Sequence, residues 1–186
     1  MPSNIASALV FIVNALTSLY LLVLLLRFWL PWLRADFRNP LAQGILKLTS
    51  PVVIPLRRIV PSFGRLDTAT ILVAFVIQYL AILLILLIIS RSAIFSDIAT
   101  TALVKLVMQS INLFMFAIFV RIILSWISPG QHNPTIAIIT TLTEPVLRPV
   151  RRIIPSMGGL DISPIFVIIA LGALTNLVMD FNVLGI

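Results

Sequence analysis

The chain alternates between long apolar stretches and shorter segments that carry most of its charges. Four stretches have the roughly 20 apolar residues that a helix needs to cross the hydrocarbon core of a bilayer. They cover residues 5–26, 69–90, 103–124 and 165–181. A segment inside lipid must satisfy its own backbone hydrogen bonds, so spanning segments of this length are helical. We therefore predict an all-α membrane protein with four transmembrane helices.

The polar segments contain an internal repeat. The stretch Thr49–Asp67 recurs as Thr143–Asp161 without a gap, and most of the paired positions are identical. In each half the repeated stretch lies between two apolar stretches. We therefore predict two parallel repeats, 1–94 and 95–186, each with two transmembrane helices and one cytoplasmic segment between them.

The chain is strongly apolar and basic, with 60% hydrophobic residues, 10% charged residues and a formal net charge of +7. All of its lysines and arginines except Arg91 and Lys105 lie between the first two apolar stretches or from the end of the third to the fourth. The positive-inside rule places these segments in the cytoplasm and both termini outside it. Because no basic residue precedes the first apolar stretch, we expect a permanent span and no cleaved signal peptide.

Each cytoplasmic segment is predicted to hold a short amphipathic helix at the membrane interface. Asn39-Pro40 and Asn133-Pro134 are typical of helix starts, with Asn as the cap and Pro in the first turn. The apolar residues that follow have helical spacing over about nine or ten residues, too few to cross a bilayer. Two prolines in each copy are then expected to break or kink the helix. They are Pro51, Pro55, Pro145 and Pro149.

Arginines beside these prolines are the candidate contacts for anionic lipid headgroups and for a protein partner. They are Arg57, Arg58, Arg148, Arg151 and Arg152. Nucleic acid is not an expected partner, because the cations border membrane spans and alternate with proline and isoleucine. A turn into the next span follows in each copy, marked by Pro61, Gly64, Pro155 and Gly158. Asp67 and Asp161 come next; each is expected to cap the following helix, and a pair with the preceding arginines is the alternative.

Five polar residues inside the third and fourth apolar stretches form a candidate intramembrane cluster. They are Lys105, Gln109, Asn112, Asn176 and Asp180. The first three share one helix face, and the last two share another. We predict that the third and fourth spans pack through these faces, with Lys105 near Asp180. The alternative is a polar path for an ion or small solute, which would require a homo-oligomer and would also use Asn14, Ser18 and Gln78.

The sequence offers little catalytic chemistry. The chain has no cysteine and a single histidine, His132, which leaves no thiolate ligands and makes a poor metal site. A phosphate-binding glycine loop, a Ser/His/Asp set and paired catalytic carboxylates are also missing from the sequence. We therefore expect a protein that is not an enzyme and that needs neither metal nor cofactor.

The repeated pattern Arg…Trp…Asn-Pro…Pro…Arg-Arg-Ile-Ile-Pro-Ser-Met-Gly-Gly-Leu-Asp-Ile-Ser-Pro resembles the YggT family of small bacterial and plastid membrane proteins. The second copy, which ends at Pro164, carries the whole pattern, whereas the first has Pro31 before its Trp and Arg65 in place of the second Gly. The resemblance implies an accessory role without a known enzymatic activity. Plastid relatives are associated with haem attachment to a b-type cytochrome and with nucleoid distribution, Gram-positive relatives with cell-division genes, and enteric-type relatives with osmotic or ion stress.

These observations favour a non-enzymatic inner-membrane accessory, assembly or scaffold factor. Its basic, proline-rich segments would dock lipids and a protein partner, because sequence identity between the two copies concentrates there. The alternative hypothesis is a transport or ion-homeostasis protein that contributes to osmotic stress tolerance and uses the intramembrane polar cluster.

Overall fold

The computed structural model describes residues 4–64, 66–127, 133–154 and 161–186. These ranges form six helices and no strand, apart from an isolated bridge between Phe63 and Leu66. The prediction of an all-α protein is thereby confirmed. The helices are α1 (Asn4–Trp32), α2 (Pro40–Arg57), α3 (Thr68–Ile88), α4 (Phe95–Ile127), α5 (Pro134–Ile153) and α6 (Ser163–Met179).

Three of these helices, α1, α3 and α4, are long and apolar enough to cross a membrane. Helix α6 is apolar but shorter: its 17 residues rise about 26 Å, close to the lower limit for a hydrocarbon core of roughly 30 Å. Helices α1 and α4, with 29 and 33 residues, continue beyond the apolar stretches that predicted them. Arg27 lies in the extension of α1, whereas Arg121 lies near the end of the predicted stretch and within α4.

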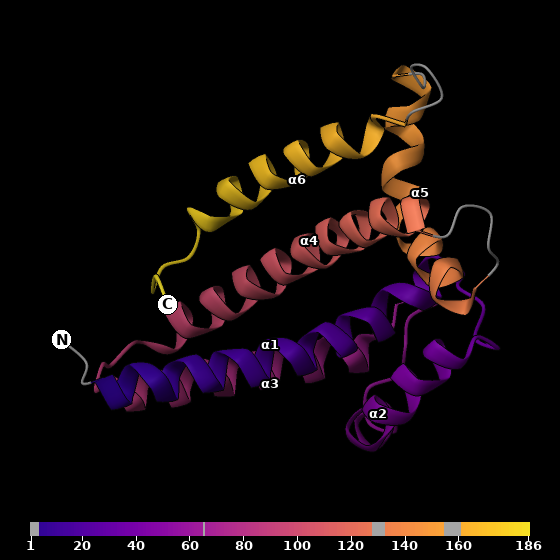
Figure 1. The fold of residues 1–186 in the computed structure, drawn as a ribbon. Coiled ribbons are helices and arrows are strands. Elements are labelled where there is room, and N and C mark those ends of the chain that lie inside the picture. The colour runs from indigo at the N-terminus through magenta and orange to yellow at the C-terminus, as the bar shows by residue number, and fades with distance from the viewer. Residues whose placement is uncertain (1–3, 65, 128–132, 155–160) are drawn as a thin grey trace.

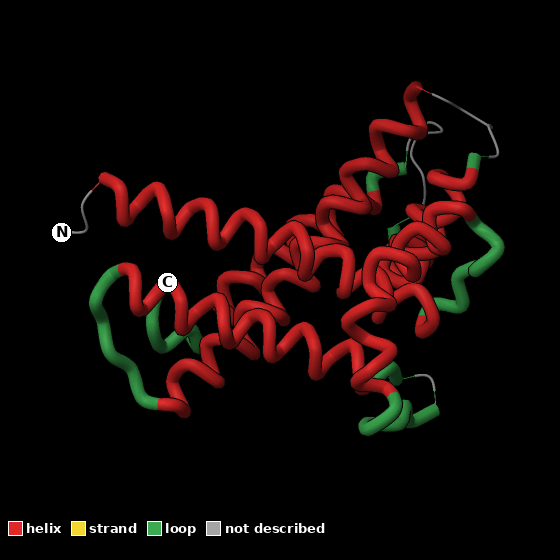
Figure 2. Tube along the Cα trace, turned by 90° about the horizontal axis from the view of Figure 1, so that it is seen from below, coloured by secondary structure: helices red, strands yellow, loops and turns green. Residues whose placement is uncertain are grey.

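The long helices form a bundle, and the two shorter amphipathic helices gather at one end of it. Helix α1 lies along α3, α4 packs on α3, and α6 packs on α4 (Figure 1). Helices α2 and α5 run at an angle to the long helices. Both views place the N- and C-terminal ends of the chain at the opposite end of the bundle (Figure 2). The two basic segments therefore share one end of the molecule.

The two halves bury equivalent positions of the repeat. In the first half, Leu24, Val53 and Val73 belong to one cluster that joins α1, α2 and α3. The equivalent residues of the second half join α4, α5 and α6 in the same way; they are Ile118, Leu147 and Val167. Because the apolar positions recur in register, each half packs as a long helix, an interfacial helix and a second apolar helix.

A further cluster joins the two halves at the basic end. Leu30 and Ala42 of the first half pack with Ala117, Ile138 and Leu142 of the second. The side chain of Asn39 adds a polar link, because its Nδ2 donates a hydrogen bond to the carbonyl oxygen of Pro134 over 2.7 Å. The interfacial helices are thus fixed to each other as well as to the bundle.

Of the breaks or kinks expected at the prolines, the breaks are wrong, and the interfacial helices are longer than the predicted nine or ten residues. Helix α2 continues through Pro51 and Pro55 for 18 residues, and α5 continues through Pro145 and Pro149 for 20 residues. All four prolines lie on the exposed side of their helices, where water or headgroups can bind the carbonyls that lose a partner. The opposite side is buried through residues such as Val53 and Leu147, and this packing offsets the cost of the interrupted ladder. The predicted helix starts at Asn39 and Asn133 are confirmed, since each side chain accepts a hydrogen bond from the backbone two residues later.

Candidate functional site

A polar network ties the three helices of the first repeat together at the basic end. Arg27 of α1 reaches α2, where its Nη1 donates to Thr49 Oγ1 over 2.8 Å and to Ser50 Oγ over 3.1 Å. On its other side Arg27 Nε lies 3.7 Å from Asp67 Oδ2, and the side chains of this pair are only 4% and 6% exposed. Arg57, at the end of α2, donates to the same carboxylate oxygen over 2.6 Å. We call Arg27, Thr49, Ser50, Arg57 and Asp67 the first arginine network.

The second repeat builds an equivalent network at the same positions. Arg121 of α4 donates to Thr143 Oγ1 over 2.7 Å and to Glu144 Oε2 over 3.0 Å. Arg151 of α5 bridges Glu144 and Asp161, with Nε 2.8 Å from Asp161 Oδ2. These five residues, Arg121, Thr143, Glu144, Arg151 and Asp161, form the second arginine network. The agreement of the two halves shows that the repeated segment specifies a set of contacts as well as a helix.

The two networks differ in charge and in burial. The first sets two arginines against the single carboxylate of Asp67, because Ser50 stands where the second has Glu144. The second has intermediate side-chain exposures, between 22% and 39%, for all its charged members. The first combines a buried pair, Arg27 and Asp67, with Arg57 at 47% exposure. In the first network, Arg27 Nε is buried without a hydrogen-bond partner. Removing either partner of such a buried ion pair is expected to destabilise the fold strongly, because it leaves a single buried charge.

Each network aspartate also receives hydrogen bonds from the start of the following helix. Asp67 is the N-cap of α3 and accepts hydrogen bonds from the backbone N and the hydroxyl of Thr70. Asp161 accepts from the backbone N and the hydroxyl of Ser163. Partial burial works to raise the pKa of Asp161, but the hydrogen bonds from Ser163 and the contact with Arg151 outweigh it and hold that pKa below its ordinary value. Asp67 therefore both caps α3 and pairs with arginine. Asp161 pairs with Arg151 and bonds the start of α6, but the N-cap of that helix is Ile162.

The other predicted arginines of the basic segments point outward. Arg58, Arg148 and Arg152 are exposed, and they take part in none of the ion pairs that the structure records for its described residues. Two large apolar side chains beside them are exposed as well, Ile59 at 77% and Ile153 at 80%. In each Arg-Arg pair the first residue thus holds the fold and the second is available for contacts.

The turn between α2 and α3 is fixed by local contacts. Gly64 has a φ of +59°, a left-handed conformation that glycine adopts without strain. The carbonyl oxygen of Pro61 accepts a hydrogen bond from Thr68 Oγ1 over 2.7 Å, which ties the turn to the first residue of α3. The equivalent Pro155 and Gly158, and also His132, lie outside the described residues.

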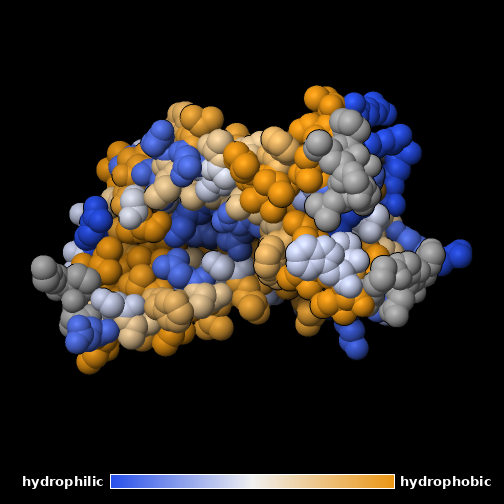
Figure 3. Space-filling model, turned by 45° about the horizontal axis from the view of Figure 1, so that its top comes forward, coloured by the Kyte–Doolittle hydropathy of each residue, from blue (hydrophilic) through white to orange (hydrophobic). Residues whose placement is uncertain are grey.

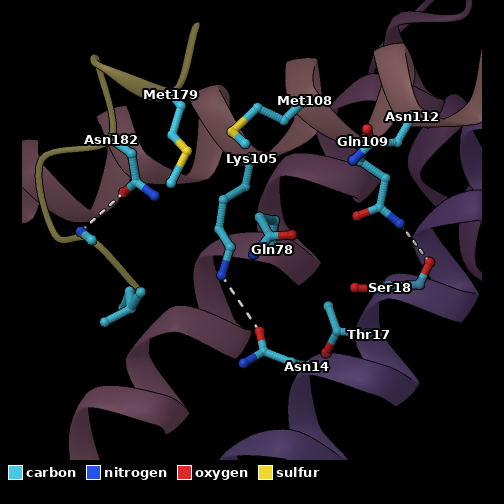
Figure 4. A pocket seen from close by; sticks show the side chains of 12 residues that line it. Asn14, Thr17, Ser18, Gln78, Lys105, Met108, Gln109, Asn112, Met179 and Asn182 are labelled. Carbon is cyan, nitrogen blue, oxygen red and sulfur yellow. Dashed lines mark hydrogen bonds between the residues drawn. The ribbon is translucent and has the colours of Figure 1, made fainter. Parts of the chain in front are cut away.

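The intramembrane polar cluster has different partners from those expected. Lys105 Nζ lies 3.4 Å from Asn14 Oδ1 of α1, and Gln109 Nε2 donates to the carbonyl oxygen of Ser18 over 2.6 Å. The recorded ion pairs of the described residues do not join Lys105 to Asp180, so that expected contact is wrong. Lys105, Gln109 and Asn112 instead line a polar pocket of about 350 Å³, whereas Asn176 and Asp180 are not among its lining residues (Figure 4).

Sequence reasoning placed Arg57, Arg151 and the two aspartates among the site residues but missed the other members of the networks. Arg27 and Arg121 occupy matching positions of the repeat, and Thr49 and Thr143 open the duplicated stretch. That shared register was a usable signal. Glu144 was harder to identify, because the first copy has Ser50 in its place.

The comparison with known proteins agrees with the duplicated architecture. The chain matches the CCB3/YggT family twice, over residues 6–88 and 100–182. It is 42% identical to the uncharacterized protein PA0392 of Pseudomonas aeruginosa over 182 residues, which cover 94% of this chain and 89% of that protein. It is 35% identical to the uncharacterized protein YggT of Escherichia coli K12 over 166 residues, which cover 89% of this chain and 86% of that protein.

A plant protein matches over a shorter segment. The YlmG homolog protein 2, chloroplastic, of Arabidopsis thaliana is 36% identical over 72 residues, which cover 37% of this chain and 27% of that protein. No solved structure matches the chain. The two family matches each cover one long helix, its interfacial helix and the apolar helix that follows. The resemblance to YggT proteins is thus confirmed, and the chain belongs to the CCB3/YggT family.

Proposed function

We propose that this protein is a non-enzymatic accessory or scaffold factor of the bacterial inner membrane, which docks anionic lipids and a protein partner through α2 and α5. The observation that carries the proposal is the difference between the two arginines of each Arg-Arg pair: the first forms ion pairs, and the second forms none within the described part of the chain. Arg57 and Arg151 are engaged in the networks that fix α2 and α5 to the bundle. Arg58, directly after α2, and Arg152, in the last turn of α5, stay exposed at the ends of those fixed helices.

The exposed side chains suit an interface between lipid headgroups and apolar chains. At the end of each interfacial helix an exposed arginine is followed by an exposed isoleucine, as Arg58-Ile59 and Arg152-Ile153. A guanidinium near the phosphates with an apolar neighbour directed toward the chains is a favourable arrangement at the inner leaflet. Figure 3 shows hydrophilic surface gathered at this end of the molecule, next to apolar surface. The same end would present the protein partner with two rigid, similarly charged helices.

The docking proposal is tested by removing only the outward-facing arginines. In the double variant Arg58→Gln, Arg152→Gln, we expect each lost cation to weaken attraction to anionic lipid by about 1 kcal/mol, or roughly fivefold. The measurement is the number of anionic lipids that the purified protein retains from mixed nanodiscs, read by native mass spectrometry. Crosslinking in the native membrane, with loss of a specific partner in the double variant, tests the protein contact.

Arg91→Gln is the matched control, because Arg91 is also exposed but lies in the connection between α3 and α4. It is expected to leave lipid retention and crosslinking unchanged. Unchanged lipid retention and unchanged partner crosslinking in the Arg58→Gln, Arg152→Gln variant would refute the docking proposal.

The proposal includes four membrane crossings, with α6 as the shortest, and a cytoplasmic location for α2 and α5. Support comes from the apolar composition of α6 and from the excess of cations at the end that carries α2 and α5. The chain has no cysteine, so single cysteines report their location without background. We expect a membrane-impermeant maleimide to label Val183→Cys in intact spheroplasts and Arg58→Cys only after lysis. Labelling of both positions from the same side would show that this topology is wrong.

A second candidate function is transport or ion homeostasis that supports osmotic stress tolerance. The polar pocket around Lys105 favours it, because polar groups within apolar helices are costly and are often retained for solutes. Flux of ions or small solutes into liposomes that contain the protein is the test, and impermeable liposomes would exclude this candidate.

A further inference from the structure

The polar pocket lies among α1, α3, α4 and the segment that follows α6. It holds about 350 Å³, and its polar lining includes Asn14, Gln78, Lys105, Gln109, Asn112 and Asn182. Figure 4 shows Lys105 and Gln78 directed into the space between α1 and the C-terminal segment. In the space-filling view, hydrophilic atoms lie in a hollow between apolar ridges (Figure 3). The pocket is therefore polar inside and apolar around its rim.

Lys105 places a positive charge in the pocket, and no Asp or Glu side chain of the lining balances it. None of the ion pairs recorded for the described residues contains Lys105. Its recorded contact is the amide oxygen of Asn14, at the long distance of 3.4 Å. An ammonium donates up to three hydrogen bonds, so most of its donor capacity is directed into the pocket. A cation among apolar helices is stabilised by an anion.

Gln78 supplies a second, independent sign that the pocket receives a ligand. Its side chain is buried, at 4% exposure, and the structure records no hydrogen bond to it from the described residues. Nearby amides are only partly used: Asn182 Oδ1 accepts from Gly185 N, and Gln109 Nε2 donates to Ser18. The remaining amide N–H groups and carbonyl oxygens can both donate and accept. These amide groups line the pocket and are not among the sealed, unpartnered atoms of the described residues, so they are accessible to a polar ligand inside it.

We propose that this pocket binds a small organic anion. The carboxylate of the anion would pair with Lys105, and its hydroxyl or similar polar groups would hydrogen-bond to the surrounding amides. The single positive charge selects one negative charge. The volume falls in the range of small-molecule sites, and the amides of Gln78 and Asn182 would bind groups beyond the carboxylate. The thioethers of Met108 and Met179 line the same pocket and would contact the apolar part of such a molecule.

This inference does not depend on the docking proposal. It deepens the transport candidate, and it rests on that candidate only because both use the same pocket. Binding is measured at equilibrium and flux is measured across a bilayer. A protein that binds without transporting is therefore distinguished from one that does neither.

The test uses lactate as the probe and 1,2-propanediol as its uncharged analogue. Saturation-transfer NMR is recorded with the full-length protein in lipid nanodiscs, and empty nanodiscs serve as the blank. We expect a saturable lactate signal with an affinity in the millimolar range, as befits a ligand of a few heavy atoms. The diol is expected to give no signal above the blank, because it lacks the carboxylate that Lys105 would bind.

Variants then assign the signal to the pocket. Lys105→Gln is expected to weaken lactate binding by about tenfold to a hundredfold, the effect of losing one charged hydrogen-bonding partner. Lys47→Gln removes the only other lysine of the chain, which is exposed on α2, and is expected to leave binding unchanged. Gln78→Leu keeps the charge but removes the buried amide, and is expected to weaken binding less than Lys105→Gln. Circular dichroism checks that each variant is folded. If Lys105→Gln does not fold, Gln78→Leu provides the test.

Three results would overturn the proposal. They are a wild-type protein that gives no lactate signal, a diol that binds as well as lactate, and folded pocket variants with unchanged lactate affinity. A second copy of the chain covering the pocket would produce the first of these results.

Discussion

Replacing Asp67 with asparagine is expected to lower the free energy of unfolding by about 3 kcal/mol, the lower end of the range for breaking a buried ion pair. The substitution keeps a side-chain oxygen for the cap of α3 but removes the charge that faces Arg27 and Arg57. The Arg27 side chain, at 4% exposure, would then be a buried cation without a counter-charge. Unfolding in increasing fractions of SDS, followed by the fluorescence of the three tryptophans, measures the loss.

Asp161→Asn is the matched control for this prediction. Asp161 occupies the same repeat position, but its side chain is 38% exposed, and Glu144 also faces Arg151. Solvent screening therefore reduces the expected loss to about 1 kcal/mol or less. The double variant Arg27→Met, Asp67→Asn should be less destabilised than the two single effects combined, because it leaves no buried unpaired charge; Arg57 is solvated. Equal losses for Asp67→Asn and Asp161→Asn would contradict this account of burial.

Thr49→Val is expected to cost about 1–3 kcal/mol, the range for leaving a buried donor without its partner. Thr49 is fully buried, and its hydroxyl accepts from Arg27 and donates to the carbonyl oxygen of Ile45 over 2.6 Å. Valine keeps the shape of the side chain and removes both hydrogen bonds. The same SDS unfolding experiment measures the change.

Thr143→Val tests the equivalent position of the second repeat. Thr143 makes the same two hydrogen bonds, to Arg121 and to the carbonyl oxygen of Ile139, but Arg121 also keeps Glu144 at 3.0 Å. A smaller loss is therefore expected than for Thr49→Val. Thr141→Val should be nearly neutral, because the hydrogen bond recorded for this hydroxyl within the described residues goes to the carbonyl oxygen of Ala137 and is exposed to solvent. A larger loss for Thr143→Val than for Thr49→Val would refute the compensating role of Glu144.

The basic segments show where local sequence rules succeed and where they fail. Asn39 and Asn133 cap α2 and α5 as predicted, because a cap depends on the next two or three residues alone. A break or a kink is predicted at Pro51 and Pro55, yet α2 continues without a break to Arg57. Packing of Val53 beneath the bundle outweighs the lost backbone bonds, and such packing cannot be evaluated from the segment alone.

The predicted contacts of the intramembrane polar cluster show the same limit of local rules. Spacing along the sequence correctly places Lys105 and Gln109 on one face of α4, since helical periodicity fixes which residues share a face. It does not fix which neighbouring helix that face meets. In the structure the face meets Asn14 and Ser18 of α1, and Asp180 of the expected partner helix takes no part.

The sequence by itself determined the all-helical architecture, the duplication and the family. Long apolar stretches in lipid must be helical, and the repeat is visible as identical residues at matching positions. Only the tertiary structure decided which residues of the repeat hold it together and which are free. Arg57 and Arg58 are neighbours in sequence, but the direction of each side chain on a packed helix brings the first to Asp67 and leaves the second exposed. Contacts between distant segments depend on helix rotation and packing, which no local pattern encodes.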